Sequence, residues 1–100
     1  MKERQIEQKL VKAAIAQKGV AMKFISPGCI GVPDRIVLLP GGMLGFVEIK
    51  APGKKPRPVQ ARRIEQLKRL GFKVYVLDSA EQIPRILDEI GGILDAIQSS

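Results

Sequence analysis

Two apolar runs separated by a proline and two glycines place the strongest constraint on how this chain can fold. Residues 36–39 and 43–49 are rich in aliphatic and β-branched side chains, and Pro40, Gly41 and Gly42 lie between them. Runs of this composition around a short glycine-containing break predict two antiparallel strands joined as a hairpin. We therefore expect a sheet built around this hairpin.

The register of the hairpin decides which charged side chains meet at its open end. If residues 40–42 form the loop, antiparallel pairing sets Asp34 opposite Glu48, whereas a two-residue loop would shift the pairing by one residue. Side chains alternate across a strand, so Glu48 and Lys50 emerge on one face and Ile49 on the other. Asp34 joins Glu48 and Lys50 only in the first register.

Two carboxylates and a lysine in this arrangement are typical of metal-dependent cleavage of phosphodiesters. Adjacent carboxylates repel each other, and a divalent cation removes the repulsion. Oxygen ligands suit Mg²⁺ or Mn²⁺, which bind through one or two carboxylates, water and substrate phosphates. Lys50 is expected to hold the scissile phosphate or the attacking water. The alternative is that Glu48 and Lys50 form an ordinary exposed charge pair at the end of a hairpin.

The order of the motifs resembles the PD-(D/E)xK nuclease superfamily and, within it, a stand-alone VRR-NUC domain. Pro33-Asp34 and Glu48-Ile49-Lys50 carry the superfamily signature. A helix with Glu7 and a glycine-rich segment over residues 26–35 precede the second motif, and Gln60 opens the helix that follows it. The resemblance implies an α/β fold in which a small mixed sheet of about four strands is flanked by helices, as in the restriction-endonuclease-like core.

The resemblance also implies roles for the residues at the hairpin end. Asp34 and Glu48 would ligate the metal, and the backbone carbonyl of Ile49 would be a further ligand. Lys50 would orient the nucleophile.

Two residues outside the hairpin receive roles mainly from the resemblance. Glu7 lies at the border of the apolar stripe of its helix, so it could reach inward and assist the metal directly or through water. Gln60 could position the site or contact a phosphate. Without the resemblance, Glu7 would be a helix-surface acid paired with a neighbouring lysine, and Gln60 would be an ordinary polar residue of a first helical turn.

The net charge of +7 is unevenly distributed along the chain. Residues 50–73 contain nine basic side chains and one acid, so this segment carries +8 and the remainder carries −1. Such a segment predicts contact with the phosphate backbone of DNA, although a solvated helix face is the alternative. The four aromatic residues lie in apolar contexts, so base stacking is not expected to dominate binding. The candidate DNA-binding residues are Arg35, Lys54, Lys55, Arg57, Arg62, Arg63, Lys68 and Arg69.

Composition sets the outer limits of these interpretations. One hundred residues with 45% hydrophobic content predict a single domain over residues 1–100 with a thin core, which makes a homodimer plausible. The lone Cys29 cannot form an internal disulfide, and the absence of His excludes a zinc site built on imidazole. With no apolar run of membrane-spanning length, we expect a soluble cytoplasmic protein that uses no organic cofactor.

The remaining periodicity predicts where the other elements lie. Gly19 is expected to end the first helix, and Ser79 with Gln82 predicts a capping box at the start of the last one. An aliphatic segment over residues 93–97 is expected to pack on the core or on a second subunit. The predicted helices cover residues 3–18, 58–70 and a segment after residue 79, and the predicted strands cover residues 20–25, 36–39, 43–49 and 73–77.

Three functions remain open from the sequence. The first is a Mg²⁺- or Mn²⁺-dependent DNA endonuclease that selects branched, flapped or four-way (Holliday) junction DNA, because so small a chain has little surface for reading bases. A two-fold dimer would then resemble a junction resolvase. The second is a non-catalytic nucleic-acid-binding module, which would gain nothing from clustered acids facing phosphates. The third is a structural partner protein that acts through its aliphatic carboxyl end.

Overall fold

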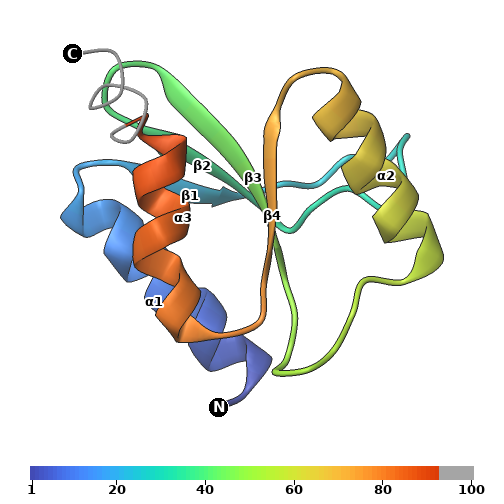
Figure 1. The fold of residues 1–100 in the computed structure, drawn as a ribbon, viewed down its shortest axis with the longest axis horizontal. Coiled ribbons are helices and arrows are strands. Elements are labelled where there is room, and N and C mark those ends of the chain that lie inside the picture. The colour runs from blue at the N-terminus through green and yellow to red at the C-terminus, as the bar shows by residue number, and fades with distance from the viewer. Residues whose placement is uncertain (93–100) are drawn as a thin grey trace.

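The computed structural model describes residues 1–92. It shows a four-stranded mixed sheet with helices on both faces (Figure 1). The strands lie in the order β1 (Val20–Lys23), β2 (Arg35–Leu39), β3 (Met43–Ile49) and β4 (Lys73–Leu77). The first three are antiparallel, and β4 is parallel to β3. The predicted architecture is therefore confirmed, while the predicted aliphatic segment over residues 93–97 lies outside the described residues.

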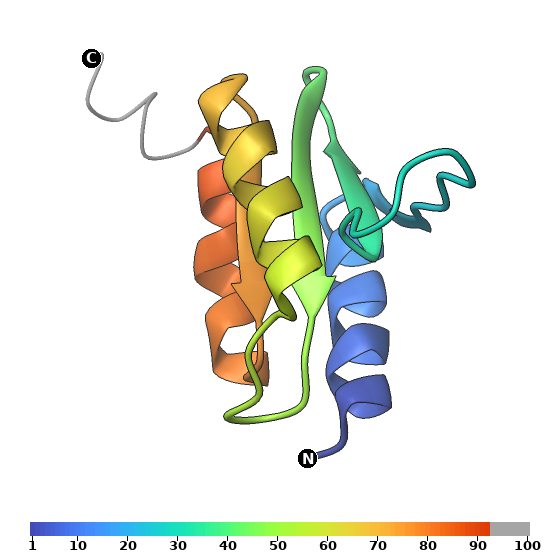
Figure 2. The same cartoon turned by 90° about the vertical axis from the view of Figure 1, so that its right-hand side faces the viewer.

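The helices divide between the two faces of the sheet. Figures 1 and 2 show α1 (Glu3–Ala16) and α3 (Ile83–Ile90) side by side on one face, and α2 (Pro58–Arg69) on the other. Parallel strands need a long crossover, and α2 provides it between β3 and β4. A short 3₁₀ turn, η1 (Ala80–Gln82), leads into α3. Within residues 1–92, no helix is long and apolar enough to cross a membrane.

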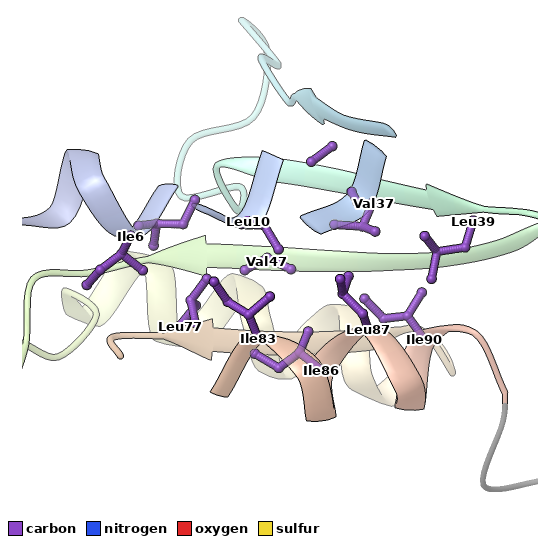
Figure 3. Packing of buried hydrophobic residues seen from close by; sticks show 13 residues of the cluster. Ile6, Leu10, Val37, Leu39, Val47, Leu77, Ile83, Ile86, Leu87 and Ile90 are labelled. Carbon is purple, nitrogen blue, oxygen red and sulfur yellow. The ribbon is translucent and has the colours of Figure 1, made fainter. Parts of the chain in front are cut away.

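Alternating strand residues pack into two separate cores. Val37, Val47 and Leu77 belong to the larger core, which they form with α1 and α3 (Figure 3). Phe46 and Val74 belong to the smaller core under α2. Odd-numbered residues of β2, β3 and β4 therefore face α1 and α3, and even-numbered residues face α2.

The hairpin adopts the first of the two predicted registers. Leu39 pairs with Met43 and Arg35 pairs with Val47, so residues 40–42 form a three-residue loop. One further step along this register sets Asp34 opposite Glu48.

The two glycines of that loop are explained by its backbone conformation. Gly41 and Gly42 have φ values of 90° and 75°. Side chains are disfavoured in this region of the backbone map, and glycine enters it without a steric cost.

The first helix ends two residues before the predicted boundary. Lys18, with a φ of 64°, takes the left-handed backbone conformation after the helix, and Gly19, the predicted helix end, lies one residue beyond it. Gly19 is instead required for packing, because a Cβ atom there would collide with the carbonyl oxygen of Leu38. The first strand also stops early, at Lys23, where the chain leaves the sheet edge for the loop before β2.

The predicted capping box between Ser79 and Gln82 is wrong. Ser79 Oγ accepts a hydrogen bond from the backbone N–H of Glu81 at 3.4 Å and so opens η1. The Gln82 amide oxygen accepts from the backbone N–H of Asp78 at 3.0 Å, and its Nε2 donates to Asp78 Oδ1 at 2.9 Å. Gln82 therefore reaches one residue further back than a capping box requires.

Candidate active site

The end of the β2–β3 hairpin assembles the acidic site predicted from the sequence. Asp34 directly precedes β2, Glu48 is the penultimate residue of β3, and Lys50 follows that strand. Asp34 Oδ2 accepts a hydrogen bond from the backbone N–H of Ile49 at 2.8 Å, which ties the Asp34 carboxylate to β3. Lys50 Nζ lies 3.2 Å from Glu48 Oε2. These contacts bring the two acids and the lysine together.

The two acids have opposite environments. Glu48 is 1% exposed and lies between two residues of the larger core, so it points to the α2 side of the sheet. Its Oε1 atom is buried and has no hydrogen-bond partner among residues 1–92. Asp34, by contrast, is exposed. The site therefore combines a buried acid, an exposed acid and a half-buried lysine.

The electrostatics of the site oppose ionisation of Glu48. Burial raises the pKa of its carboxyl group, and the negative charge of Asp34 raises that pKa further. The hydrogen bond and positive charge of Lys50 lower the pKa but do not cancel the rise. A bound divalent cation would favour the ionised form instead. The arrangement can therefore accept a cation with a gain in electrostatic stability.

Gln60 lies in the first turn of α2, on the side of the sheet that Glu48 faces. Figure 2 shows α2 beginning near the end of the sheet where β3 finishes. Gln60 is 9% exposed, and its amide oxygen accepts from the backbone N–H of Arg57 at 2.9 Å. The side chain thus caps α2, while its amide nitrogen has no partner among the described residues.

Glu7 lies apart from the other two acids. Its Oε2 atom is 2.9 Å from Nε of Arg35, whose side chain lies on the α1 side of the sheet. Arg35 also donates to the backbone oxygen of Ala21 at 2.9 Å. The described part of the chain contains no group of three or more acidic, His or Cys side chains that could hold a metal. The structure thus pairs Glu7 with a base, but with Arg35 and not with a lysine, and its role at the metal stays a prediction.

Most of the predicted DNA-binding residues are exposed, but two are engaged within the protein. Arg35 pairs with Glu7, and Arg63 donates to the backbone oxygen of Ile30 at 3.2 Å and to Gln66 Oε1 at 2.6 Å. The sequence carried no signal for these long-range contacts. The exposed candidates are Lys54, Lys55, Arg57, Arg62, Lys68 and Arg69.

The loop before Asp34 is fixed against α2. Gly31 has a φ of 79°, and a Cβ atom there would lie 2.8 Å from the backbone oxygen of Val59. Arg63 holds the neighbouring residue Ile30 from the same helix. The glycine therefore allows the loop to approach α2 closely, and this packing positions Asp34 just before the start of β2.

Comparison with known proteins agrees with this geometry. Residues 1–81 match the family model of the VRR-NUC domain. The chain belongs to the VRR-NUC family. A protein of Acyrthosiphon pisum secondary endosymbiont phage 1 named "Putative nuclease p44" is 51% identical over 81 residues, which is 81% of this chain and 87% of the phage protein. A solved structure described as a VRR_NUC domain superposes with a TM-score of 0.82 at 31% identity, covering 88% of this chain and 96% of that one.

Family membership settles the broad activity of this VRR-NUC domain. The family match and the phage relative identify it as a nuclease. The structural neighbour shares the sheet and its flanking helices, which confirms the predicted fold.

Proposed function

We propose that this VRR-NUC domain is a DNA endonuclease that depends on Mg²⁺ or Mn²⁺ bound by Asp34 and Glu48. The observation that carries the proposal is the buried Glu48 carboxylate with one unpartnered oxygen. An unsatisfied buried acceptor costs stability, so a small domain has little reason to retain one unless function requires it. A cation that binds this oxygen explains why it is retained.

The oxygen donors at the hairpin end fit such a cation. Mg²⁺ binds through one or two carboxylates and completes its shell with water and substrate phosphates. Asp34 and Glu48 supply the carboxylates, and the carbonyl of Ile49 supplies a third protein oxygen. Glu7, whose Oε2 atom is held by Arg35, would assist directly or through water. When bound, the cation supplies charge neutralisation at the scissile phosphate and activation of water.

Lys50 is placed to act on the phosphate. Its side chain is 16% exposed, and its ammonium group already lies at the Glu48 carboxylate. From this position it can hold a non-bridging phosphate oxygen or the attacking water, and it can stabilise negative charge that develops during cleavage. Gln60 can donate a hydrogen bond to the same region through its amide nitrogen.

The surface around the site favours recognition of DNA shape over recognition of base sequence. The exposed cations of α2 and of the loop before it can bind DNA phosphates, which carry no sequence information. They are Lys54, Lys55, Arg57, Arg62, Lys68 and Arg69. The rings of Phe24 and Phe46 pack on each other in the smaller core with a centroid separation of 5.7 Å, so these two rings do not form a stacking surface for bases. Phe72 packs edge-on against Phe46 and is 46% exposed. We infer selectivity for branched, flapped or junction DNA, with two sites paired in a homodimer.

Cleavage of labelled duplex, flap and four-way-junction DNA with Mg²⁺ or Mn²⁺ tests the proposal. Cutting should require the cation and should fall by about 10²-fold or more in Asp34→Asn and Lys50→Ala proteins. Asp88→Asn, which changes an acid near the carboxyl end of α3, on the face of the sheet opposite to Glu48, should cut like the wild type. Cutting in the presence of a chelator, or wild-type rates in Asp34→Asn, would refute the proposed chemistry.

A further inference from the structure

A second basic surface lies on the opposite face of the sheet from α2. A groove of about 520 Å³ runs between α1 and the ends of β1 and β2. None of its basic side chains belongs to the strongly basic segment over residues 50–73. The groove is lined by Arg4, Glu7, Gln8, Val11, Lys12, Lys23 and Arg35.

The groove carries an excess of positive charge that the described residues do not neutralise. Its one acid, Glu7, is matched by Arg35 at 2.9 Å. The other cations, Arg4, Lys12 and Lys23, are exposed and have no partner among the described residues. Three unpaired cations in one concave surface repel one another, and they are stabilised by an anionic ligand with several charges.

The groove begins at the end of the β2–β3 hairpin where the candidate active site lies. Arg35 follows Asp34 in the chain and pairs with Lys23 across β1 and β2. The backbone N–H of Phe24 also donates to the backbone oxygen of Asp34 at 2.8 Å. Because α1 and α2 lie on opposite faces of the sheet (Figure 1), the groove and the basic surface of α2 flank the site from its two sides.

We propose that this groove binds the sugar–phosphate backbone of the DNA strand beside the scissile bond. The inference rests on the proposed endonuclease function and adds a second contact surface to it. A DNA strand carries one negative charge per nucleotide, so a strand with its scissile phosphate at Lys50 presents further phosphates to either side. Gln8 can donate to a phosphate or sugar oxygen, and Val11 gives the sugar an apolar contact. Such contacts position the strand without reading its bases.

Charge removal from the groove tests the inference. The double variant Lys12→Gln/Lys23→Gln removes two exposed cations whose side chains make no hydrogen bond or ion pair within residues 1–92, so the fold should be preserved. The matched control Lys9→Gln/Lys18→Gln removes two exposed cations of the α1 region that do not line the groove. Binding to a labelled DNA duplex is measured in chelator over a range of salt concentrations.

The groove variant should bind about eightfold more weakly per lysine at about 0.1 M salt, and its log–log salt slope should fall by about 2. The control should match the wild type in both quantities. If the wild type binds and cuts but the groove variant keeps its affinity and slope, the inference is overturned while the nuclease proposal stands, and the groove belongs to another anionic ligand such as an acidic protein. Equal losses in the two double variants also overturn it. A wild type that neither binds nor cuts DNA refutes the proposed function and the inference with it.

Discussion

Replacing Glu48 by Gln should stabilise the metal-free domain at neutral pH. The substitution preserves the shape of a side chain that is 1% exposed, and it removes a charge that burial and Asp34 both disfavour. The amide oxygen can still accept from Lys50, and the amide nitrogen can donate to the Asp34 carboxylate, because the two acid side chains lie within hydrogen-bonding reach of each other. The loss of the Lys50 ion pair is smaller than the gain, because the net shift of the Glu48 pKa is upward.

The size of the effect follows from the unpartnered Oε1 atom. A buried polar atom without a hydrogen bond costs about 1–3 kcal/mol, and more when its group is charged. Subtracting the lost ion pair leaves an expected gain of about 1–2 kcal/mol. For a domain of this length such a gain raises Tm by about 4–16 °C.

The pH dependence gives the prediction a defined sign. The folded protein binds a proton at Glu48 more tightly than the unfolded chain does, because the folded-state pKa is raised. This stabilising contribution is fully present below the unfolded-state pKa and is lost as pH rises through the folded-state pKa. The Gln variant has no such loss. The gap in Tm between variant and wild type should therefore open as pH rises above the ordinary glutamate range.

Thermal unfolding in chelator, followed by circular dichroism from about pH 4 to about pH 8, measures this gap. Glu81→Gln is the control, since it removes an exposed acid of the same type. Addition of Mn²⁺ should then raise the Tm of the wild type and leave that of the Gln variant unchanged. A variant that is less stable than the wild type at neutral pH, or a gap that does not change with pH, would refute the electrostatic interpretation of the site.

Two further predictions concern the elements around the site. Gly31→Ala should destabilise by about 1–3 kcal/mol in urea unfolding, because its φ is 79° and a Cβ atom would meet Val59, whereas Gly28→Ala in the open part of the same loop should change stability by less than about 1 kcal/mol. Glu7→Gln and Arg35→Gln should each cost about 1 kcal/mol at this partly exposed pair, and a double-mutant cycle should show them to be non-additive; additive losses would mean that the contact contributes nothing to stability.

The hairpin and its site were predictable from local sequence because their information is local. Strand periodicity and two glycines predicted the hairpin and left two registers open, and the structure has the three-residue loop that sets Asp34 opposite Glu48. The burial of Glu48 could not be predicted from the same pattern. An acid that alternates with core residues along a strand is equally typical of a strand whose other face is exposed to solvent. The burial of Glu48 comes from tertiary packing on the α2 side of the sheet, where Lys50 and Asp34 also lie against its carboxyl group.

Contacts between distant segments could not be predicted in this way. Glu7 and Arg35 are 28 residues apart in the sequence, and Arg63 and Ile30 are 33 apart. Neither contact therefore produces a periodic pattern in the sequence. The groove on the α1 side likewise gathers cations from three separate elements, whereas the basic segment over residues 50–73 is visible as a run. Cations that folding brings together from separate elements do not form a basic run in the sequence.

Asp34 contributes both to the structure of the hairpin and to the candidate active site. Pro33 is buried just before it, and the β2–β3 ladder ends at the pair Arg35 and Val47. Beyond that pair, the Asp34 carboxylate accepts the hydrogen bond of the Ile49 N–H at 2.8 Å and so extends the contact between the strands by one residue.

The two roles of Asp34 can be separated by choice of substitution. Asp34→Ala should abolish cutting and also destabilise the domain by about 1–3 kcal/mol, because it leaves the Ile49 N–H without its acceptor. Asp34→Asn keeps an acceptor oxygen in the same place, so it should abolish cutting with a smaller loss in urea unfolding. If both variants unfold at the same urea concentration, the hydrogen bond to Ile49 does not stabilise the hairpin, and Asp34 serves the chemistry alone.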